Sequence, residues 1–463
     1  MDMLVSPLIA AARVAQRQYE SYDQAAVDAV VTAAGWAIMH PEHNRILAEM
    51  AVRDTGLGVI EDKITKNHRK TLGLLRDLKG ARSVGVIAEY PALGIVEIAR
   101  PVGVVAAITP STNPGATPAN KIINALKGRN AVIIAPSPKG ASTCAALLDF
   151  INAELDKVGA PHDLVQMLPS PITKDATHAL MRHADLVVAT GSQANVRAAY
   201  ASGTPAFGVG AGNVAVIIDS SANLAEAAAA IALSKTFDNA TSCSSENSVV
   251  ILDAIHDVAM AELAKVGGVL LEDAEKAALQ ATMWQHGKLN AQTTAQSTAM
   301  ISMLAGLPRP ETASAAFLMV SETGTGPACP FSGEKLAPVL AVYRARDFDH
   351  ACKIVAEIYA YQGAGHSVGI HSADDAHILR LGLELPVSRV IVNQVHCYAT
   401  GGSFDNGLPF SLSMGCGTWG RNNFSDNMNY RHYLNITRIS RRIAPREPTL
   451  DEIFGEHFSK YGK

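Results

Sequence analysis

The sequence predicts an α/β protein with at least two domains, each built on a parallel sheet. Its 463 residues exceed what a single hydrophobic core serves. Glycine is frequent, with 36 residues, and aromatic residues make up only 5% of the chain, as in α/β proteins with many tight turns. From residue 102 onward, short apolar runs alternate with helical patterns. That alternation is typical of parallel sheets with both faces covered by helices.

The first 83 residues are predicted to be mostly helical. Between residues 24 and 51, apolar side chains recur every three or four positions. The pattern changes at residues 83–100, where short alternating runs flank Pro91. Such runs predict a β-hairpin or an extended arm.

The first α/β series occupies residues 102–218. We expect strands at 103–108, 131–135, 164–168, 186–189 and 214–218, and helices at 117–126, 141–158, 174–183 and 192–201. Gly159 follows the second of these helices, as expected for a residue that ends a helix.

The second series follows a domain boundary that we place near Ser220. We expect helices at 222–237, 257–265, 349–358 and 373–381, and strands at 248–252, 336–342, 368–370 and 389–393. Residues 401–429 are rich in Gly, Ser and Asn and are expected to form loops. A long irregular stretch in a compact protein usually lines a site or an interface.

Composition and charge exclude several function classes. The net charge is −4 with no block of Lys or Arg, so neither nucleic acid nor an anionic membrane is an expected partner. No apolar run is long enough to span a membrane, and the first 20 residues form an amphipathic pattern rather than a secretory signal. The six cysteines lack CxxC spacing and no HExxH occurs, so we expect reduced thiols, a cytoplasmic location and no metal site.

Cys243 is a candidate nucleophile. It lies in the turn FDNATSCSSEN, between an expected helix and strand, and its neighbours Ser242, Ser244 and Ser245 are small and polar. Backbone amides of such a turn are expected to lower the pKa of the thiol and stabilise the nucleophilic thiolate. A small residue packed under a helix end is the alternative.

Asn113 is a candidate oxyanion donor. It lies between two prolines in Thr109-Pro110-Ser111-Thr112-Asn113-Pro114, directly after the strand expected at 103–108. Ligands of parallel sheets bind at the carboxyl ends of strands, and an amide NH₂ there can donate to a developing negative charge. An Asx turn is the alternative interpretation.

Two glycine-containing segments are candidate ligand loops. Gly191 and Ser192 open the helix expected at 192–201, where free N–H groups can hold a phosphate, although an ordinary serine N-cap explains the pattern equally well. The segment 208–213, GVGAGN, precedes a strand and opens no helix, so it is not a dinucleotide fingerprint. We interpret it as a flexible loop that closely approaches a ligand.

Two further polar residues are weaker candidates. Glu334, in EKLAP, is expected by default to form a surface salt bridge. His366 follows two glycines near an expected strand and is a candidate general base, although a lone histidine is more often structural.

In their order along the chain, these segments resemble the aldehyde dehydrogenase superfamily over residues 5–435, and more narrowly its CoA-acylating branch. The resemblance rests on PVGVVAAITPSTNP, KIINALKGRNAVIIAPSPK, VVATGSQANVRAAYASGTPAFGVGAGN, FDNATSCSSENSVV, EKLAPVLAVY, GHSVGIHS, RVIVNQ and SLSMGCGTWGRN. Within the branch, STNPGATPAN and FDNATSCSSEN are most similar to the enzymes that act on sulfoacetaldehyde.

The resemblance implies an aldehyde dehydrogenase-like fold, with two Rossmann-like parallel-sheet domains and a small oligomerisation arm. Residues 1–220 would form the cofactor-binding domain, with the arm at about 83–100, and residues 221–429 the catalytic domain. Residues 430–463 would form a tail that contributes to the interface of a homodimer or homotetramer.

The resemblance also implies the site residues. Cys243 would carry the thioester, Asn113 would hold the oxyanion and His366 would ease proton transfer from the CoA thiol. The cofactor, NADP or NAD, would contact Thr109, Pro110, Ser111, Ser137, Lys139, Gly191, Ser192, Val209, Gly210, Glu334 and Leu336, with Glu334 on the nicotinamide ribose.

Two departures from the hydrolytic members favour the acylating branch and leave the cofactor open. Hydrolytic members carry a water-activating Glu in the loop that here reads GVGAGN, and no carboxylate occurs from Ala206 to Ile218. Without that base, water attacks a thioester slowly, and transfer of the acyl group to a thiol can be faster than hydrolysis. In the ribose turn, Lys139 stands near the position where the superfamily often has Glu, which permits NADP without requiring it.

The sequence therefore predicts an enzyme that oxidises a short aldehyde, with sulfoacetaldehyde as a candidate, through a thioester on Cys243 that CoA accepts. The reaction is reversible, since both sides hold thioesters. Two alternatives stay open, a catalytically silent scaffold homologue and a γ-glutamyl phosphate reductase-like enzyme.

Overall fold

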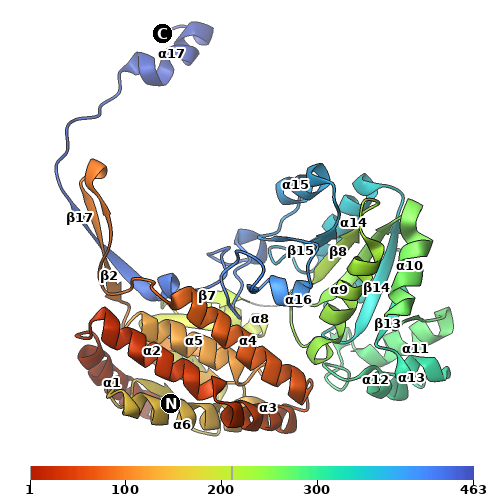
Figure 1. Ribbon diagram of the computed structural model, residues 1–463, viewed down its shortest axis with the longest axis horizontal. Coiled ribbons are helices and arrows are strands. Elements are labelled where there is room, and N and C mark those ends of the chain that lie inside the picture. The colour runs from red at the N-terminus through yellow and green to blue at the C-terminus, as the bar shows by residue number, and fades with distance from the viewer. Residues whose placement is uncertain (1, 210–211) are drawn as a thin grey trace.

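The computed structural model describes residues 2–209 and 212–463. Figure 1 shows two sheet-containing regions side by side and an arm that projects from the first of them. In the described part of the chain, the first region has a five-stranded parallel sheet in the order β5-β4-β3-β6-β7. The second region has a seven-stranded parallel sheet in the order β10-β13-β14-β9-β8-β15-β16. The predicted α/β class with two parallel sheets is confirmed.

The first region carries its helices on both sides of the sheet. Its strands are β3 (Val104–Thr109), β4 (Ala131–Pro136), β5 (Val165–Met167), β6 (Leu186–Thr190) and β7 (Ala206–Val209). Its helices are α1 (Asp2–Tyr19), α2 (Gln24–Met39), α3 (Pro41–Thr55), α4 (Ile60–Leu78), α5 (Ala116–Lys127), α6 (Ala141–Lys157), α7 (Lys174–His183) and α8 (Gln193–Ala201). All residues of β3 and β4 are buried, as expected for continuous apolar runs in a sheet covered on both faces.

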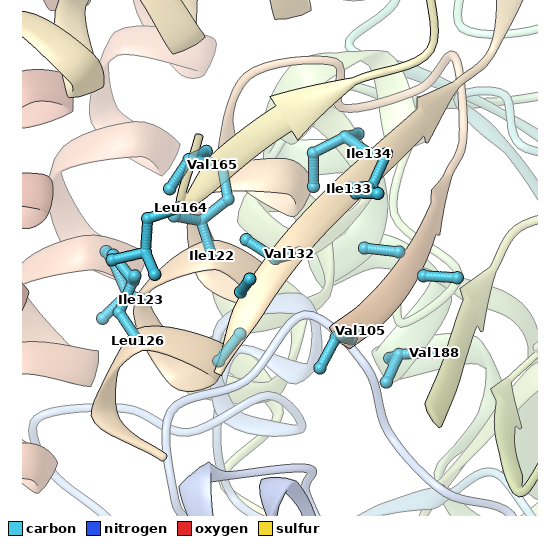
Figure 2. Packing of buried hydrophobic residues seen from close by; sticks show 14 of the residues in the cluster. Val105, Ile122, Ile123, Leu126, Val132, Ile133, Ile134, Leu164, Val165 and Val188 are labelled. Atoms are coloured by element: carbon cyan, nitrogen blue, oxygen red, sulfur yellow. The ribbon is translucent and has the colours of Figure 1, made fainter. Parts of the chain in front are cut away.

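Aliphatic side chains of these strands pack against α5 and form the first core. Figure 2 shows Val132 of the sheet close to Ile122 of the helix, with Val105, Ile133 and Leu126 among the other buried side chains. These five side chains have no exposed surface. Burying a side chain of this size contributes about 1.5–3 kcal/mol, so the core fixes the strand ends that bear the candidate loops.

The second region repeats the pattern. Its strands are β8 (Val214–Ile218), β9 (Glu246–Leu252), β10 (Gly268–Leu270), β13 (Phe317–Ser321), β14 (Val339–Ala345), β15 (Val368–His371) and β16 (Val390–Val392). Its helices are α9 (Leu224–Thr236), α10 (His256–Lys265), α11 (Asp273–Met283), α12 (Thr298–Ala305), α13 (Pro310–Ser314), α14 (Phe348–Tyr361), α15 (Asp375–Glu384) and α16 (His396–Ala399). A small hairpin, β11 (Trp284–Gln285) and β12 (Lys288–Leu289), follows α11.

Four local predictions need correction. Val214–Ile218 forms β8, which pairs with β9 and β15 and so belongs to the second sheet, although it precedes the boundary placed near Ser220. The loop expected at 208–213 begins inside strand β7 (Ala206–Val209). The strand expected from Leu336 begins only at Val339, because Leu336 has a positive φ of 45°. The elements from β10 to β13 were not predicted at all. The division into domains at 220 and 429 stays a prediction.

The arm is a three-stranded antiparallel sheet. It consists of β1 (Gly85–Tyr90), β2 (Ile95–Pro101) and β17 (Leu434–Ser440), with β2 in the middle. The predicted hairpin at 83–100 is thus confirmed, and the tail supplies its third strand. Beyond β17 the chain runs to helix α17 (Leu450–Tyr461), which lies far from both sheet regions (Figure 1).

Candidate active site around Cys243

Cys243 lies on the predicted turn, between the 3-10 turn Phe237–Ala240 and strand β9. The backbone of this turn is unusual, because Asp238, Asn239 and Ala240 all have positive φ angles, of 53°, 50° and 57°. Non-glycine residues take up this conformation only where the surroundings hold them there. The thiol is half-buried, and its Sγ lies 3.5 Å from Nε2 of His366.

The residue that holds this turn is Asp238, through a buried ion-pair cluster. Its Oδ2 accepts from Nζ of Lys63 at 3.1 Å and from Nζ of Lys66 at 2.5 Å, and both lysines belong to α4. Its Oδ1 accepts from the backbone N–H of Val59 at 2.9 Å. Burial alone would raise the pKa of the Asp238 carboxyl, yet the ammonium groups of Lys66 and Lys63 hold that pKa below its usual value. The carboxylate is therefore charged and paired with α4.

Lys66 also orients Asn113. Its Nζ donates to Oδ1 of Asn113 at 3.0 Å. An ammonium group can only donate, so this contact fixes the amide oxygen toward Lys66 and leaves the amide NH₂ as the group facing away from it. A cavity of about 40 Å³ is lined by Asn113 and by Ser242, the neighbour of Cys243. The Asn113 amide and the turn that carries the thiol therefore line one cavity.

The charge state of Cys243 differs from the prediction. The pKa of the thiol is raised to about 12, chiefly by burial and, in the same direction, by Glu334 and Cys416. Contacts with Ser244 and with backbone amides do lower the pKa, as expected, but they are the smaller effects. The prediction of a lowered thiol pKa was wrong, because burial among residues distant in sequence outweighs the contacts that lower it.

The ring of His366 is neutral near pH 7. The side chain is buried, and this burial, together with the charge of Arg389, lowers its pKa to about 3. Its Nδ1 lies 2.8 Å from Oγ of Ser367. In the tautomer whose Nδ1–H donates to that hydroxyl, the lone pair of Nε2 faces the Cys243 thiol and can accept a hydrogen bond from it.

Glu334 does not form the expected surface salt bridge. It is half-buried, and its Oε1 accepts from the backbone N–H of Gly212 at 3.2 Å. Burial raises the pKa of its carboxyl to about 8. Gly212 is itself confined, because a Cβ there would lie 2.4 Å from the backbone O of Cys243 and 3.1 Å from Cδ2 of His366. The glycine segment thus lies against the backbone of Cys243 and the ring of His366; its expected approach to a ligand stays a prediction.

A second cavity lies at the carboxyl ends of β3, β4 and β6. Its volume is about 510 Å³, and it brings together these predicted residues: Thr109, Pro110, Ser111, Ser137, Gly191 and Ser192. Oγ1 of Thr109 is buried without a hydrogen-bond partner, and Ser192 caps the N-terminus of α8. A polar orphan and a helix N-terminus in one cavity fit an anionic, polyhydroxylated ligand such as a dinucleotide.

The other predicted cofactor residues are more scattered. Lys139 is exposed and does not line this cavity. Val209 is buried at the end of β7, Glu334 contacts Gly212, and Leu336 accepts a backbone hydrogen bond from Ala295. Gly210 lies outside the described residues.

Several functional candidates were missed. The cavity at β3, β4 and β6 is also lined by Thr173, Lys174 and His178, and the Cys243 turn depends on Lys63 and Lys66. The spacing of Lys63, Lys66 and Lys70 along one side of α4 was the available signal, but charged residues at three- and four-residue spacing usually mark a solvated helix face.

No helix among the described residues is long and apolar enough to cross a membrane. No group of His, Cys, Asp or Glu side chains within the same residues could hold a metal ion.

The Glu334 carboxylate should suppress the reactivity of Cys243. We predict that Glu334→Gln raises the rate of Cys243 alkylation by iodoacetamide about threefold at pH 9, where the Glu334 charge is present. At pH 6 Glu334 is protonated, so the two proteins should react alike. The measurement is alkylation rate against pH by peptide mass spectrometry, with Glu311→Gln, an exposed site, as the control. Superimposable profiles would remove Glu334 from the surroundings that set the thiol pKa.

The sequence profile of the aldehyde dehydrogenase family matches residues 3–405. An acylating sulfoacetaldehyde dehydrogenase from Cupriavidus necator is 65% identical over 459 residues, which are 99% of this chain and 93% of the relative. A crystal structure of an acetylating aldehyde dehydrogenase from Geobacillus thermoglucosidasius superposes with a TM-score of 0.93 at 35% identity, covering 97% and 98% of the two chains.

A propionaldehyde dehydrogenase from Rhodopseudomonas palustris, solved with bound propionyl-CoA, has a TM-score of 0.85 at 25% identity over 94% of each chain. The resemblance to acylating aldehyde dehydrogenases that the sequence motifs predicted is confirmed by these relatives. The chain belongs to the aldehyde dehydrogenase family.

Proposed function

We propose that the protein is a CoA-acylating aldehyde dehydrogenase that oxidises a short aldehyde with NAD(P)⁺ through a thioester on Cys243. The observation that carries the proposal is the joint placement of the Cys243 thiol, the neutral His366 ring 3.5 Å away and an Asn113 amide oriented by Lys66. Together these groups supply a nucleophile, a proton acceptor and an oxyanion donor.

In the first half-reaction, Sγ of Cys243 adds to the aldehyde carbon while Nε2 of His366 accepts the thiol proton. The carbonyl oxygen becomes an oxyanion, which the Asn113 amide and the backbone N–H of Cys243 stabilise. One such donor is worth about 3 kcal/mol. A nicotinamide cofactor held beside this site would supply the hydride acceptor, and the acyl group would then remain on Cys243 as a thioester.

The residues that would hold the dinucleotide line the cavity at β3, β4 and β6. Ser192 and the N-terminus of α8 suit a phosphate, and Oγ1 of Thr109 and the Ser137 turn offer polar groups to the rest of the ligand. No carboxylate lines this cavity among the described residues, and Lys174 and His178 do. We therefore propose that NADP⁺ is accepted, since a 2′-phosphate meets the Lys174 ammonium there and no carboxylate.

In the second half-reaction, the thiol of CoA attacks the acyl-Cys243 thioester. No carboxylate lies from Ala206 to Ile218, so the glycine segment beside Cys243 offers no base for water. The carboxylate that does influence Cys243, Glu334, is engaged with the backbone of Gly212. After His366 has released the first proton to solvent, it accepts the proton of the CoA thiol and returns it to Sγ of Cys243, which leaves as the acyl–Sγ bond breaks and acyl-CoA forms.

The substrate we propose is sulfoacetaldehyde. The Cupriavidus necator relative carries that substrate in its name and is 65% identical to this chain. A small cavity of about 40 Å³ beside Asn113 suits a two-carbon aldehyde.

We propose that the arm and tail join copies of this chain into a homodimer or homotetramer. The tail helix α17 stands away from the rest of the chain (Figure 1) and exposes Leu450, Ile453, Phe454 and Tyr461. Exposed apolar residues of this kind are typical of an interface. We propose the cytoplasm as the compartment, because a catalytic thiol must stay reduced and the cytoplasm keeps thiols reduced.

Removal of the tail tests the oligomer. A chain that ends after Ser440 keeps all of β17 but lacks α17. We predict that light scattering finds it in a smaller assembly than the full chain, because the apolar contacts of the tail are lost. An unchanged mass would mean that α17 has no part in self-association.

Asn113 should act in the transition state. We predict that Asn113→Ala lowers kcat about a hundredfold with a smaller change in cofactor affinity, because one oxyanion donor is lost. Asn113→Asp has the same size and can still accept from Lys66, but it cannot donate, so it should lose activity as severely. If Asn113→Asp kept wild-type kcat, the residue would be only a structural turn.

The missing water-activating base makes turnover depend on CoA. Without CoA we predict a burst of one reduced nicotinamide per active site, followed by a stall, and a restart when CoA is added. Stopped-flow absorbance with NADP⁺ and with NAD⁺ measures the burst and the cofactor preference together, and Cys243→Ala should give no burst.

Two other outcomes would contradict the proposal. Steady turnover without CoA, at a rate comparable to the CoA reaction, would mean that another base activates water. Absence of any burst with every short aldehyde would favour the catalytically silent scaffold. Oxidation of NADPH with an acyl phosphate as the only accepted substrate would favour the γ-glutamyl phosphate reductase-like alternative.

A further inference from the structure

The cavity beside Asn113 is cationic. Besides Asn113 and Ser242, its walls include Lys66, Arg69 and Lys70, which follow one another along α4, and the ring of Tyr398. No carboxylate is among the residues that line it in the described part of the chain. A neutral aldehyde needs no cation near it, so three cations in one small cavity call for an explanation.

Two of the three cations, Lys66 and Lys70, already donate hydrogen bonds to other protein groups. Nζ of Lys66 is bound to Asp238, Asn113 and Thr241. Nζ of Lys70 donates to the backbone oxygens of Tyr398, Gly401 and Gly402, at 3.3, 2.9 and 3.1 Å. Burial lowers the pKa of Lys70 to about 7, which weakens its charge near neutral pH. These lysines hold protein segments together and have no donor left for a ligand.

Arg69 differs from both lysines. Its guanidinium lies over the ring of Tyr398, at 4.6 Å from the centroid, and near that of Phe404, at 5.5 Å. Its one hydrogen bond is long, 3.4 Å from Nη2 to Oγ of Ser403. Within residues 2–209 and 212–463, no carboxylate forms an ion pair with it. A guanidinium has five N–H donors in a rigid fork, so most of the donors of Arg69 remain available.

We propose that Arg69 binds the anionic group of the substrate, so that the enzyme selects short aldehydes that carry a sulfonate or a similar oxoanion. This inference rests on the proposed function and assigns its substrate preference to one residue. The aldehyde oxygen would lie toward Asn113 and the oxoanion toward Arg69, at opposite ends of one small cavity. The fork suits an oxoanion because two parallel N–H groups can donate to two of its oxygens.

The aromatic stack explains why Arg69 suits this role. Tyr398 and Phe404 fix the plane of the guanidinium before a ligand arrives, so little rotamer freedom is lost on binding. Tyr398 lies in helix α16 and Arg69 in α4, so the anion would be held where the two sheet regions meet. Binding of the anionic group by Arg69 would raise kcat/KM for anionic aldehydes, because it would place their carbonyl carbon near Cys243.

The test compares substrates that differ in charge. We predict that Arg69→Met lowers the ratio of kcat/KM for sulfoacetaldehyde to that for propionaldehyde about a hundredfold, as expected for loss of one partner of a desolvated ion pair. Arg69→Lys, which keeps the charge but loses the fork, should give an intermediate ratio and covers the case in which Arg69→Met does not fold. An unchanged ratio in both variants would overturn the proposal.

Arg76 provides the matched control. It belongs to the same helix and also stacks on aromatic rings, at 4.8 Å from Phe410 and 5.6 Å from Phe404, but it is paired with Asp77 at 2.8 Å. Arg76→Met should leave the substrate ratio at the wild-type value. An equal loss of the ratio in this variant would show that aromatic packing, rather than the charge in the cavity, is responsible.

A second measurement needs no turnover. Ethanesulfonate should slow the alkylation of Cys243 by iodoacetamide in the wild type and in Arg76→Met, but not in Arg69→Met, while 1-propanol should protect none of them. If the wild type oxidised no aldehyde, the proposed function would fall, and this protection would still report on the anion site. Protection that persisted in Arg69→Met would contradict the anion site alone.

Discussion

The buried ion-pair cluster of Asp238 with Lys63 and Lys66 joins three parts of the chain that must act together. Asp238 belongs to the turn that carries Cys243, the two lysines belong to α4, and Lys66 reaches the loop of Asn113. Loss of one partner from such a cluster costs about 3–5 kcal/mol, because the remaining charge is left buried. The cluster therefore holds the strained turn in place, and through Lys66 it links the Asn113 side chain to that turn.

Much of the fold could be predicted because its strands are continuous apolar runs. Strands β3, β4 and β8 lie at or within one residue of the predicted positions. Strands β10, β11 and β12 were missed because they have three, two and two residues, too short for a periodic pattern. Helices α11, α12 and α13 and strand β13 were not predicted either. The sheet that receives β8 depends on partners far along the chain, which a local pattern does not reveal.

The candidate site also combines features that local sequence reveals with features that depend on residues distant in sequence. Cys243, Asn113 and His366 are recognisable from local motifs, and the structure brings Cys243 and His366 to 3.5 Å. The pKa of Cys243 could not be predicted from its serine neighbours, because Glu334, distant in sequence, contributes to raising it. Lys63 and Lys66 resemble a solvated helix face in sequence, and only their contact with Asp238 buries them. Arg69 stands out only once its aromatic neighbours and the cavity are seen together.

The central claim is that Cys243 carries the acyl group between the aldehyde and CoA. Its most direct test is peptide mass spectrometry of the enzyme quenched in acid after reaction with a short aldehyde and NADP⁺ in the absence of CoA. We predict one acyl group on the peptide that contains Cys243, and its disappearance when CoA is added before the quench. Formation of reduced nicotinamide with no acyl group on Cys243, or with the acyl group on another residue, would contradict the claim.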